Sequence, residues 1–597
     1  MTETGRYAPL RSYAAIGDGR SVALVARDGG IDWLAWPDLD SDSVFGALLD
    51  ARLGGSCELA PQVPFRTTRR YVTDTNVLET TFHTELGTVQ VVDALTLHGT
   101  RLGPSRELQR RVHGVTGCVP MSWAVRPRFG FGLRTPRLAW RSNVAVATSG
   151  SDAVAVICGG VGTPGIRNGV IQGSFESRAG ESAILAVCGA DKEPLVFPTA
   201  RELDERLART IASWHDWTAR LTASGPWREE IVRSALTLKL LIYAPSGAIA
   251  AAPTTSLPEQ LGGERNWDYR YSWIRDSVFT LGSLLRLGCA AEAEAYFWWL
   301  AQATQLTHPR LQPMYRLDGG PRLPERSLPL AGYRSSRPVR IGNAASAQLQ
   351  LDSYGELLHT AWLYTESGRR LDTEIASRLA DTADLVCRLW REPDAGIWEV
   401  RSAPAQFTHS KMMCWVALDR ARLLAEAGQI PAAHHDRWQE EGSACEDFIE
   451  AQCYSSSLAS YTRAAGHEEL DASVLLGLLS GYGSARSERW KGTVDAVAQG
   501  LGRGPYVLRY TGEDGLSGTE GAFLSCSFWL AESLARVGRV REATTLMDQL
   551  VALHNDVGLY AEEVDPATGA FLGNLPQGLS HLALISAALA IAEEGAR

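Results

Sequence analysis

Residues 266–276 read Asn266-Trp267-Asp268-Tyr269-Arg270-Tyr271-Ser272-Trp273-Ile274-Arg275-Asp276 and lead directly into an apolar, helix-like run at 277–285. The stretch combines four aromatic rings with two arginines and two aspartates. Such a mixture suits neither plain core nor plain surface, because buried charges need partners and exposed rings leave apolar area in water. Rings pack on the C–H faces of a sugar, while Asp and Arg each bind neighbouring hydroxyls through two hydrogen bonds. The stretch therefore indicates a sugar site, although a plain helix start, with Asp276 near the helix dipole and paired to Arg270 or Arg275, explains it equally well.

Around and beyond this stretch, apolar residues recur at helical spacing. The periodicity predicts twelve helices, near 228–243, 275–288, 290–304, 347–367, 370–391, 409–427, 431–451, 471–478, 483–500, 520–537, 539–554 and 579–595. Gly538 separates two of them as a short connection between antiparallel helices. Helices joined alternately by tight turns and long irregular stretches are typical of a ring of six helix pairs, which we expect over residues 228–597. The sequence has no repeat of fixed period, which disfavours a regular solenoid.

The N-terminal part has the pattern of short strands. Two apolar runs, 21–26 and 31–36, flank Asp28-Gly29-Gly30 and predict a hairpin. Compact β-branched runs at 153–157 and 183–187 extend the pattern. We therefore expect an antiparallel β-sandwich over residues 1–200 and a helical linker over 201–227.

Length, charge and cysteine content narrow the class of protein. A chain of 597 residues exceeds one typical core, so two domains are expected. The formal net charge of −10 argues against a nucleic-acid-binding surface. We expect no membrane span because no run approaches eighteen apolar residues, and the absence of an export signal at the N-terminus predicts a cytoplasmic protein. The ten cysteines are scattered without a CxxC pair, so buried thiols are expected, with no metal and no cofactor.

Two loops carry glutamates that could serve as catalytic carboxylates. Glu399 follows Trp398 in the stretch 394–401, and Glu562 follows Ala561 in the stretch 558–566. Carboxylates from two separate loops can flank a glycosidic bond, with one kept protonated by an apolar wall such as Trp398 and the other ionised. Taken singly, a loop glutamate is more often a solvated charge or a helix cap.

A second pair of tryptophans leaves two hypotheses open. Trp33 and Trp36 precede a run of acidic residues at 38–42. The pair either forms a loop that reaches a neighbouring sugar site or belongs to the core of the sandwich.

Taken together, these stretches resemble the bacterial glucoamylase-like branch of glycoside hydrolase family 15, which includes glucoamylases, glucodextranases, trehalases and isomaltose-cleaving glucohydrolases. The resemblance rests on an ordered set of motifs that spans nearly the whole chain. The set comprises Gly17-Asp18-Gly19-Arg20, Gly30-Ile31-Asp32-Trp33, the stretch 266–276, Gly342-Asn343-Ala344-Ala345, Gln348-Leu349-Gln350-Leu351-Asp352, Gly396-Ile397-Trp398-Glu399, Glu520-Gly521-Ala522-Phe523, and Glu562-Glu563-Val564-Asp565-Pro566 through His581. Ser272 departs from the pattern, since Cys is expected there in much of the branch, and we expect that change to alter packing and not chemistry.

The resemblance implies a β-sandwich followed by an (α/α)6-barrel catalytic domain. It implies that Glu399 is the general acid and Glu562 the general base. It also implies a substrate-binding set, with Arg275 and Asp276 gripping the terminal glucose; the full set expected here is Tyr269, Trp273, Arg275, Asp276, Trp398, Glu520 and Trp36. In an inverting enzyme the two carboxyl groups lie roughly 6.5–9.5 Å apart, because a water must fit between them.

The function implied is an inverting, exo-acting α-glucoside hydrolase that releases β-glucose. Without a visible leader, the expected substrates are short α-linked glucosides such as isomaltose and isomalto- or malto-oligosaccharides. Three alternatives remain: an α,α-trehalase of the same family, an inverting disaccharide phosphorylase, and a sugar-binding protein without catalysis. Contacts between loop side chains and the sugar beyond the first one, each worth about 1–3 kcal/mol, determine which glycosidic linkage is preferred. The sequence does not show where these side chains lie.

Overall fold

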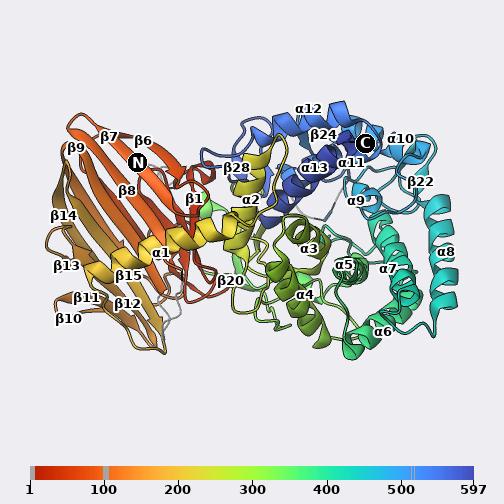
Figure 1. Ribbon diagram of the computed structural model, residues 1–597, viewed down its shortest axis with the longest axis horizontal. Helices are drawn as coiled ribbons and strands as arrows, with labels where there is room; N and C mark the ends of the chain where they lie inside the picture. The colour runs from red at the N-terminus through yellow and green to blue at the C-terminus, as the bar shows by residue number, and fades with distance from the viewer. Residues whose placement is uncertain (1–6, 98–105, 513, 516–517, 519, 597) are drawn as a thin grey trace.

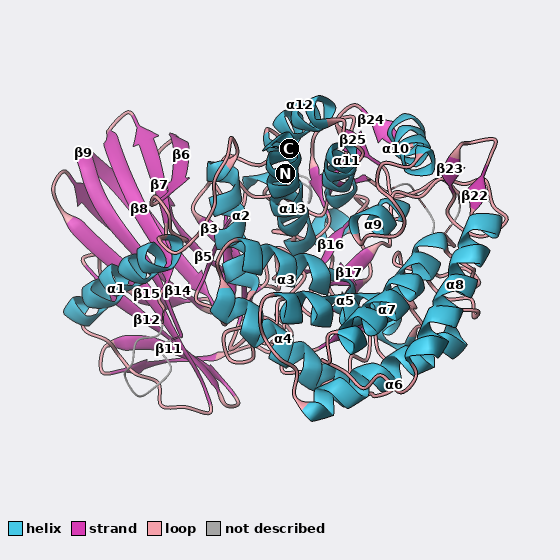
Figure 2. Cartoon of the chain, turned by 45° about the vertical axis from the view of Figure 1, so that its right-hand side comes forward, coloured by secondary structure: helices cyan, strands magenta, loops and turns pink. Residues whose placement is uncertain are grey.

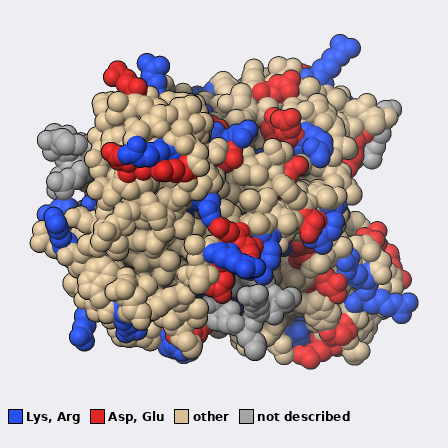
Figure 3. Space-filling view, turned by 60° about the vertical axis from the view of Figure 1, so that its left-hand side comes forward, with Lys and Arg blue, Asp and Glu red and all other residues tan. Residues whose placement is uncertain are grey.

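The computed structural model describes residues 7–97, 106–512, 514–515, 518 and 520–596 (Figure 1). Residues 1–6, on which the expectation of no export signal rests, lie outside the described residues. The chain forms a layered β part, red to orange in Figure 1, and a ring of helices, green to blue. On the face drawn in Figure 3, acidic and basic side chains are interspersed.

Fifteen antiparallel strands within the described residues form the β part (Figure 2). They are β1 (Ala14–Gly17), β2 (Val22–Val25), β3 (Gly30–Ala35), β4 (Ser43–Phe45), β5 (Ser56–Pro61), β6 (Phe65–Tyr71), β7 (Leu78–Thr84), β8 (Gly87–Leu95), β9 (Arg106–Arg126), β10 (Arg137–Arg141), β11 (Val144–Ser149), β12 (Asp152–Gly159), β13 (Gly165–Arg167), β14 (Val170–Arg178) and β15 (Ser182–Asp191). The hairpin predicted from the sequence is confirmed as β2 paired with β3.

Strand β9 belongs to both layers of the β part. Its first half pairs with β8 and β15, and its second half pairs with β5 and β14. Hydrogen bonding therefore continues from one layer into the other through a single strand. The sequence prediction of an antiparallel sandwich is confirmed, and β9 is the strand that its two layers share.

Helix α1 (Ala200–Thr218) follows the last strand and lies along the sheet (Figures 1 and 2). A capping box starts it, with Thr199 and Glu202 bonding each other's backbone N–H groups. Leu203 packs on Ile184 and Ala186 of β15. The segment expected as a helical linker is thus fixed to the β part by its apolar face.

The C-terminal part contains twelve further helices within the described residues, one in each predicted segment. They are α2 (Arg228–Leu241), α3 (Ser277–Arg286), α4 (Ala290–Gln305), α5 (Asp352–Glu366), α6 (Thr373–Leu389), α7 (Thr408–Glu426), α8 (His435–Gln452), α9 (Val474–Leu479), α10 (Glu488–Gly500), α11 (Leu524–Arg536), α12 (Val540–Val551) and α13 (Gly578–Ala596). The odd-numbered helices α3 to α13 each contact the next, and α13 contacts α3, which closes an inner ring. The even-numbered helices pack outside it, as expected for an (α/α)6 barrel (Figure 1).

Burial separates the two layers of helices. Helix α11 is buried along its length, whereas α12 buries only Ala543, Met547 and Leu550. Helix α13 is long and apolar enough to cross a membrane by length and composition, a property that we did not expect from the sequence. Because 67% of that window is buried inside the protein, its apolar character is explained by its place in the inner ring.

Short strand pairs occupy the long loops and hold them in place. The pairs are β16 (Thr255–Pro258) with β17 (Asn266–Asp268), β18 (Ser272–Trp273) with β19 (Met314–Tyr315), β20 (Arg326–Leu328) with β21 (Val339–Ile341), β22 (Tyr454–Ser455) with β23 (Ser460–Tyr461), β24 (Gly502–Arg503) with β25 (Tyr506–Val507), and β26 (Ala522–Phe523) with β27 (Glu563–Val564) and β28 (Phe571–Leu572).

The two parts are joined by hydrogen bonds as well as by packing. Trp33 is fully buried and its Nε1 donates to the carbonyl of Pro253 (2.8 Å). Arg270 donates to the carbonyl of Ser41 (2.6 Å) in the acidic loop after β3. One cluster of buried apolar side chains runs through both parts. The ten cysteines are all free, and eight of them are buried, as the sequence predicted.

Candidate active site

Four of the residues predicted from the sequence, Tyr269, Arg275, Trp398 and Glu399, line a polar pocket of about 490 Å³ in the helical part. Its walls come from β16, β17, the loop after α6 and the segment before β26. The lining residues are Glu259, Arg265, Trp267, Tyr269, Arg275, Trp398, Glu399, Arg401, Arg509, Tyr510, Asp514 and Phe523. The convergent charged groups are those of a site for a small polar ligand.

Glu399 lies in this pocket on a strained backbone. Its φ of 55° is in the left-handed region that non-glycine residues rarely adopt. Glu399 Oε1 accepts a hydrogen bond from Trp273 Nε1 (2.7 Å) and lies 3.4 Å from Arg275 Nη1. Arg275 is itself fixed by donating to the carbonyl of Ile397 (2.8 Å). These two donors therefore orient Oε1 of the Glu399 carboxylate, and Oε2 accepts neither of these bonds.

Glu562 is fully buried and is not among the residues that line this pocket, whereas its neighbour Tyr269 is. Its Oε2 accepts from the backbone N–H of Asn574 (3.0 Å), whereas its Oε1 has no hydrogen-bond partner among the described residues. Burial, and to a lesser extent the charge of the neighbouring Glu259, raises the pKa of Glu562 to about 8. The distance between the two carboxyl groups stays a prediction.

The Tyr269 side chain lies near both glutamates, Glu399 and Glu562. Burial and the nearby charges of Glu562 and Glu399 raise the pKa of its hydroxyl. Its ring meets Trp273 edge to face at 5.2 Å, so Trp273 forms a buried base under the pocket. Both residues were predicted from the stretch 266–276, and the structure brings them together with Arg275.

Asp276 is buried and is not among the residues that line the pocket. Its Oδ1 is 3.6 Å from Arg275 Nε, and burial raises its pKa to about 6. Asp352, at the start of α5, is another buried carboxyl facing Arg275, with a pKa raised by burial to about 7. Both oxygens of Asp352 are without a hydrogen-bond partner among the described residues. Arg275 thus provides positive charge to more than one carboxyl group.

The role of Trp398 as an apolar wall for Glu399 stays a prediction. Trp398 lines the pocket, but its Nε1 donates to Asp471 (2.9 Å) and its ring packs against Phe523. The indole that contacts the Glu399 carboxylate is Trp273. The hydrogen bond to the Glu399 carboxylate thus comes from a residue distant in sequence.

Trp36 is the predicted residue that the structure does not place with the others. It lines a separate cavity of about 340 Å³ in the β part, together with Arg106 and Asp152. Its ring lies over Gly189 of β15, where a Cβ would overlap it. The loop after β3 does approach the helical part, but through Asp40, which pairs with Arg316 (2.9 Å), and not through the indole.

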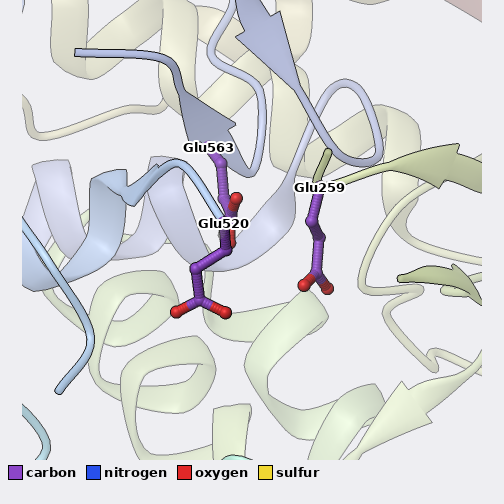
Figure 4. A group of neighbouring side chains, drawn as sticks. All are labelled: Glu259, Glu520 and Glu563. Carbon is purple, nitrogen blue, oxygen red and sulfur yellow. The ribbon is translucent and has the colours of Figure 1, made fainter. Parts of the chain in front are cut away.

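Three carboxylates beside the pocket form a group that was only partly predicted from the sequence. Glu259, Glu520 and Glu563 each place an oxygen within 4.8 Å of the others, an arrangement that could hold a cation (Figure 4). Arg509 already supplies a positive charge there: its Nη2 lies 3.0 Å from Glu259 Oε2 and 3.5 Å from Glu563 Oε1, and it also bonds Glu520.

Glu520 was predicted to bind substrate, yet it is not among the lining residues. It bonds Arg509 and also Arg265 (3.0 Å), and both arginines line the pocket. Asp514 holds Arg265 with two further bonds of 2.6 and 3.0 Å. The pair Arg509-Tyr510 repeats the ring-beside-guanidinium pattern of the stretch 266–276, a signal from which this wall could have been found.

Comparisons with known proteins agree with this geometry. Residues 225–589 match the model of glycosyl hydrolases family 15, and residues 4–189 match a trehalase-like N-terminal domain. A trehalase of Mycolicibacterium smegmatis is 37% identical over 99% of this chain and 92% of its own length. A trehalase of Thermoplasma volcanium is 31% identical over 98% of this chain and 93% of its own.

Among solved structures, a bacterial glucoamylase complexed with acarbose aligns with a TM-score of 0.74 at 14% identity, covering 98% of this chain and 94% of that one. That likeness concerns the fold. The family model covers more than half of the chain and includes every predicted site residue except Trp36. The chain therefore belongs to glycosyl hydrolases family 15 and is a glycoside hydrolase.

Proposed function

We propose that this enzyme hydrolyses α,α-trehalose to two molecules of glucose. The observation that carries the proposal is the similarity to proteins named trehalase, which extends over nearly the full length of both chains and includes the β part. From the sequence we expected isomaltose and malto-oligosaccharides first and trehalose second, and the relatives favour trehalose.

The pocket chemistry supports a disaccharide with hydroxyls on both rings. Arg275 and Glu399 lie at one wall, while Arg265, Arg509 and Asp514 form a second charged wall. Trehalose has two equivalent glucose rings and no reducing end, so each ring needs polar partners.

The mechanism we propose is a single displacement with inversion. Glu399 gives a proton, carried on the free Oε2, to the glycosidic oxygen as the bond from that oxygen to one anomeric carbon breaks. A water attacks the same carbon from the opposite face and passes its proton to Glu562. We place that water at the unpartnered Glu562 Oε1, beside Tyr269. Because Glu562 must be ionised to accept the proton, activity should fall as the pH drops below about 8.

The test is a time-resolved proton NMR assay of the purified enzyme with trehalose, isomaltose and maltose. Inversion at one carbon of trehalose produces one β-glucose, while the departing sugar is released as α-glucose, so both anomers should appear initially in equal amounts. α-Glucose alone would show retention and exclude this mechanism. Faster release from isomaltose or maltose than from trehalose would restore the first expectation.

Further measurements distinguish a trehalase from a phosphorylase and from a binding protein without catalysis. Glu562→Gln should abolish turnover while trehalose still binds, and appreciable residual activity would assign the base to another residue. Formation of glucose 1-phosphate that depends on added phosphate would identify a phosphorylase. Binding without release by the unmodified enzyme would leave a sugar-binding protein.

A further inference from the structure

The position of the Glu562 carboxylate depends on the hairpin that follows it. The backbone N–H of Glu562 donates to the carbonyl of Asn574 (3.1 Å), and the N–H of Asn574 donates back to Glu562 Oε2 (3.0 Å). Asn574 comes two residues after β28, and β28 pairs with β27, which starts directly after Glu562. Gly573 lies so close that a Cβ there would overlap Glu562 Oε2. The Glu562 carboxylate is therefore bonded to the backbone that continues from β28, where Gly573 and Asn574 are also held by Pro258 and Thr254.

A single arginine from the start of the chain binds this hairpin. Arg11 Nη1 donates to the carbonyl of Gly569 (3.0 Å), in the turn between β27 and β28. Its Nη2 donates to the carbonyls of Leu553 (3.0 Å) and His554 (2.9 Å), just after α12. Its guanidinium lies 4.7 Å from the ring centroid of Phe571 in β28. One side chain thus joins the hairpin to the end of a helix and covers its second strand.

The β part anchors the same region at two further points. Asn555 Nδ2 donates to the carbonyl of Tyr13 (2.7 Å), two residues after Arg11. Asp556 pairs with the buried Arg69 (2.6 Å) and with Arg27 (2.9 Å). The segment 553–556 is therefore held against the β part, and Arg11 transfers that support to the hairpin.

We propose that Arg11 is a positioning residue of the catalytic reaction, which sets the place of Glu562 through the β27–β28 hairpin. The contacts form a continuous series from Arg11 to Gly569 and Phe571, along β28, through Asn574 to Glu562 Oε2. This inference rests on the proposed role of Glu562 as general base. Under this proposal the β part, which carries neither of the two catalytic glutamates, helps to position one of them.

The experiment compares Arg11→Met with Arg27→Met. Methionine keeps the length of the side chain and removes every donor. Arg27 is the matched control because it contacts the same segment through Asp556 alone and is half-exposed, with 52% of its side chain accessible. Displacing a catalytic group by about 1 Å can reduce turnover by about 100-fold, so for Arg11→Met we expect kcat to fall by about 10- to 100-fold with KM changed less than about twofold. Arg27→Met should match the unmodified enzyme, and Arg11→Lys should recover part of the loss.

A pH profile of activity distinguishes a positioning role of Arg11 from a general contribution of Arg11 to stability. A looser hairpin admits water to Glu562, and relief of burial lowers its pKa, so the acid limb of kcat/KM should move to lower pH in Arg11→Met. The titratable and charged groups that face Glu562, namely Tyr269, Glu259, Glu563 and Arg509, are unchanged in this variant. Loss of thermal stability with an unchanged kcat per folded molecule and an unchanged profile would overturn the proposal and leave Arg11 a structural contact.

Hydrogen exchange followed by mass spectrometry provides a measure independent of turnover. Peptides covering 562–574 should exchange faster in Arg11→Met and Arg11→Lys than in Arg27→Met, and equal exchange would contradict the proposed link. If Arg11→Met does not fold, Arg11→Lys carries both measurements. Failure of the unmodified enzyme to release glucose from trehalose would refute the proposed function without changing the exchange result, so the two failures are distinguishable.

Discussion

Glu399 and Glu562 are both loop glutamates, yet their surroundings differ. Glu399 is tied by an indole N–H and lies near a guanidinium at the pocket wall. Glu562 is enclosed by Gly573, Asn574 and Tyr269 and has one oxygen without a partner among the described residues. A buried carboxyl of this kind costs stability when it is charged, and that cost is a testable property of the residue.

Replacing Glu562 by glutamine should stabilise the protein at alkaline pH. Burial raises the pKa of Glu562 from 4.5 to about 8, so between these values the folded chain holds a proton that the unfolded chain has lost. Folding stability then falls as the pH rises through this window. Glutamine does not ionise, so the apparent Tm of Glu562→Gln relative to the unmodified enzyme should increase from pH 5 to pH 8.

The measurement is scanning fluorimetry at several pH values. Glu229→Gln, at an exposed position on α2, serves as the control and should follow the unmodified enzyme throughout. A constant difference between Glu562→Gln and the unmodified enzyme over this window would show that Glu562 ionises normally in the folded protein.

At the scale of elements, the β27–β28 hairpin depends on a glycine directly beside Glu562. Gly573 has a φ of +70°, and a Cβ there would overlap the carboxylate. Since displacement of a reacting group by about 1 Å can lower turnover by about 100-fold, Gly573→Ala should reduce kcat on that order. Gly504, between β24 and β25, has nearly the same φ of +67° but open space around it.

Gly504→Ala therefore carries the same backbone strain without the overlap. Steady-state kinetics with trehalose should show near-normal kcat for Gly504→Ala and a large loss for Gly573→Ala. Equal losses in the two variants would attribute the effect to the strained backbone.

The helices could be predicted from the sequence, whereas the loop structure could not. Each periodic segment contains a helix, but α5 starts at Asp352 and not near 347, because 344–347 form a separate 3-10 turn. Similarly, α11 starts at Leu524 and not near 520, because Ala522 and Phe523 pair with β27. Two-residue strand pairs of this kind depend on partners distant in sequence, which periodicity does not detect.

The same limit applies to the candidate site. The stretch 266–276 indicated Tyr269, Trp273 and Arg275 because rings and charges are adjacent in sequence. The wall built from Arg265 and Arg509 was missed, because its charge balance depends on carboxylates from three segments, at Glu259, at 514–520 and at Glu563. Trp36 was assigned to the site for a related reason. An indole near acidic residues in the sequence fits a sugar site, but the sequence does not show where in the fold that indole lies.

At the scale of the molecule, the two parts should unfold together. One cluster of buried apolar side chains spans both parts, and the buried Arg69 pairs across the boundary with Asp556. Removing one partner of a buried ion pair costs about 3–5 kcal/mol, which is large beside the net stability of about 5–15 kcal/mol of a typical domain. We therefore expect a single calorimetric transition for the full chain.

Differential scanning calorimetry provides the check, with Asp556→Asn as the informative variant. Its single transition should move to lower temperature as a whole. Two resolved transitions in the unmodified enzyme, or a shift of only part of the signal in the variant, would show that the parts melt independently.

Strand β9 has a consequence for engineering. Its 21 residues bond both layers of the β part, so a new chain end or an inserted tag within 106–126 would separate the layers. The turns at Gly150 and Gly180 have open space around them and lie outside that strand. Circular permutants and reporter fusions of this hydrolase should be opened at those two turns.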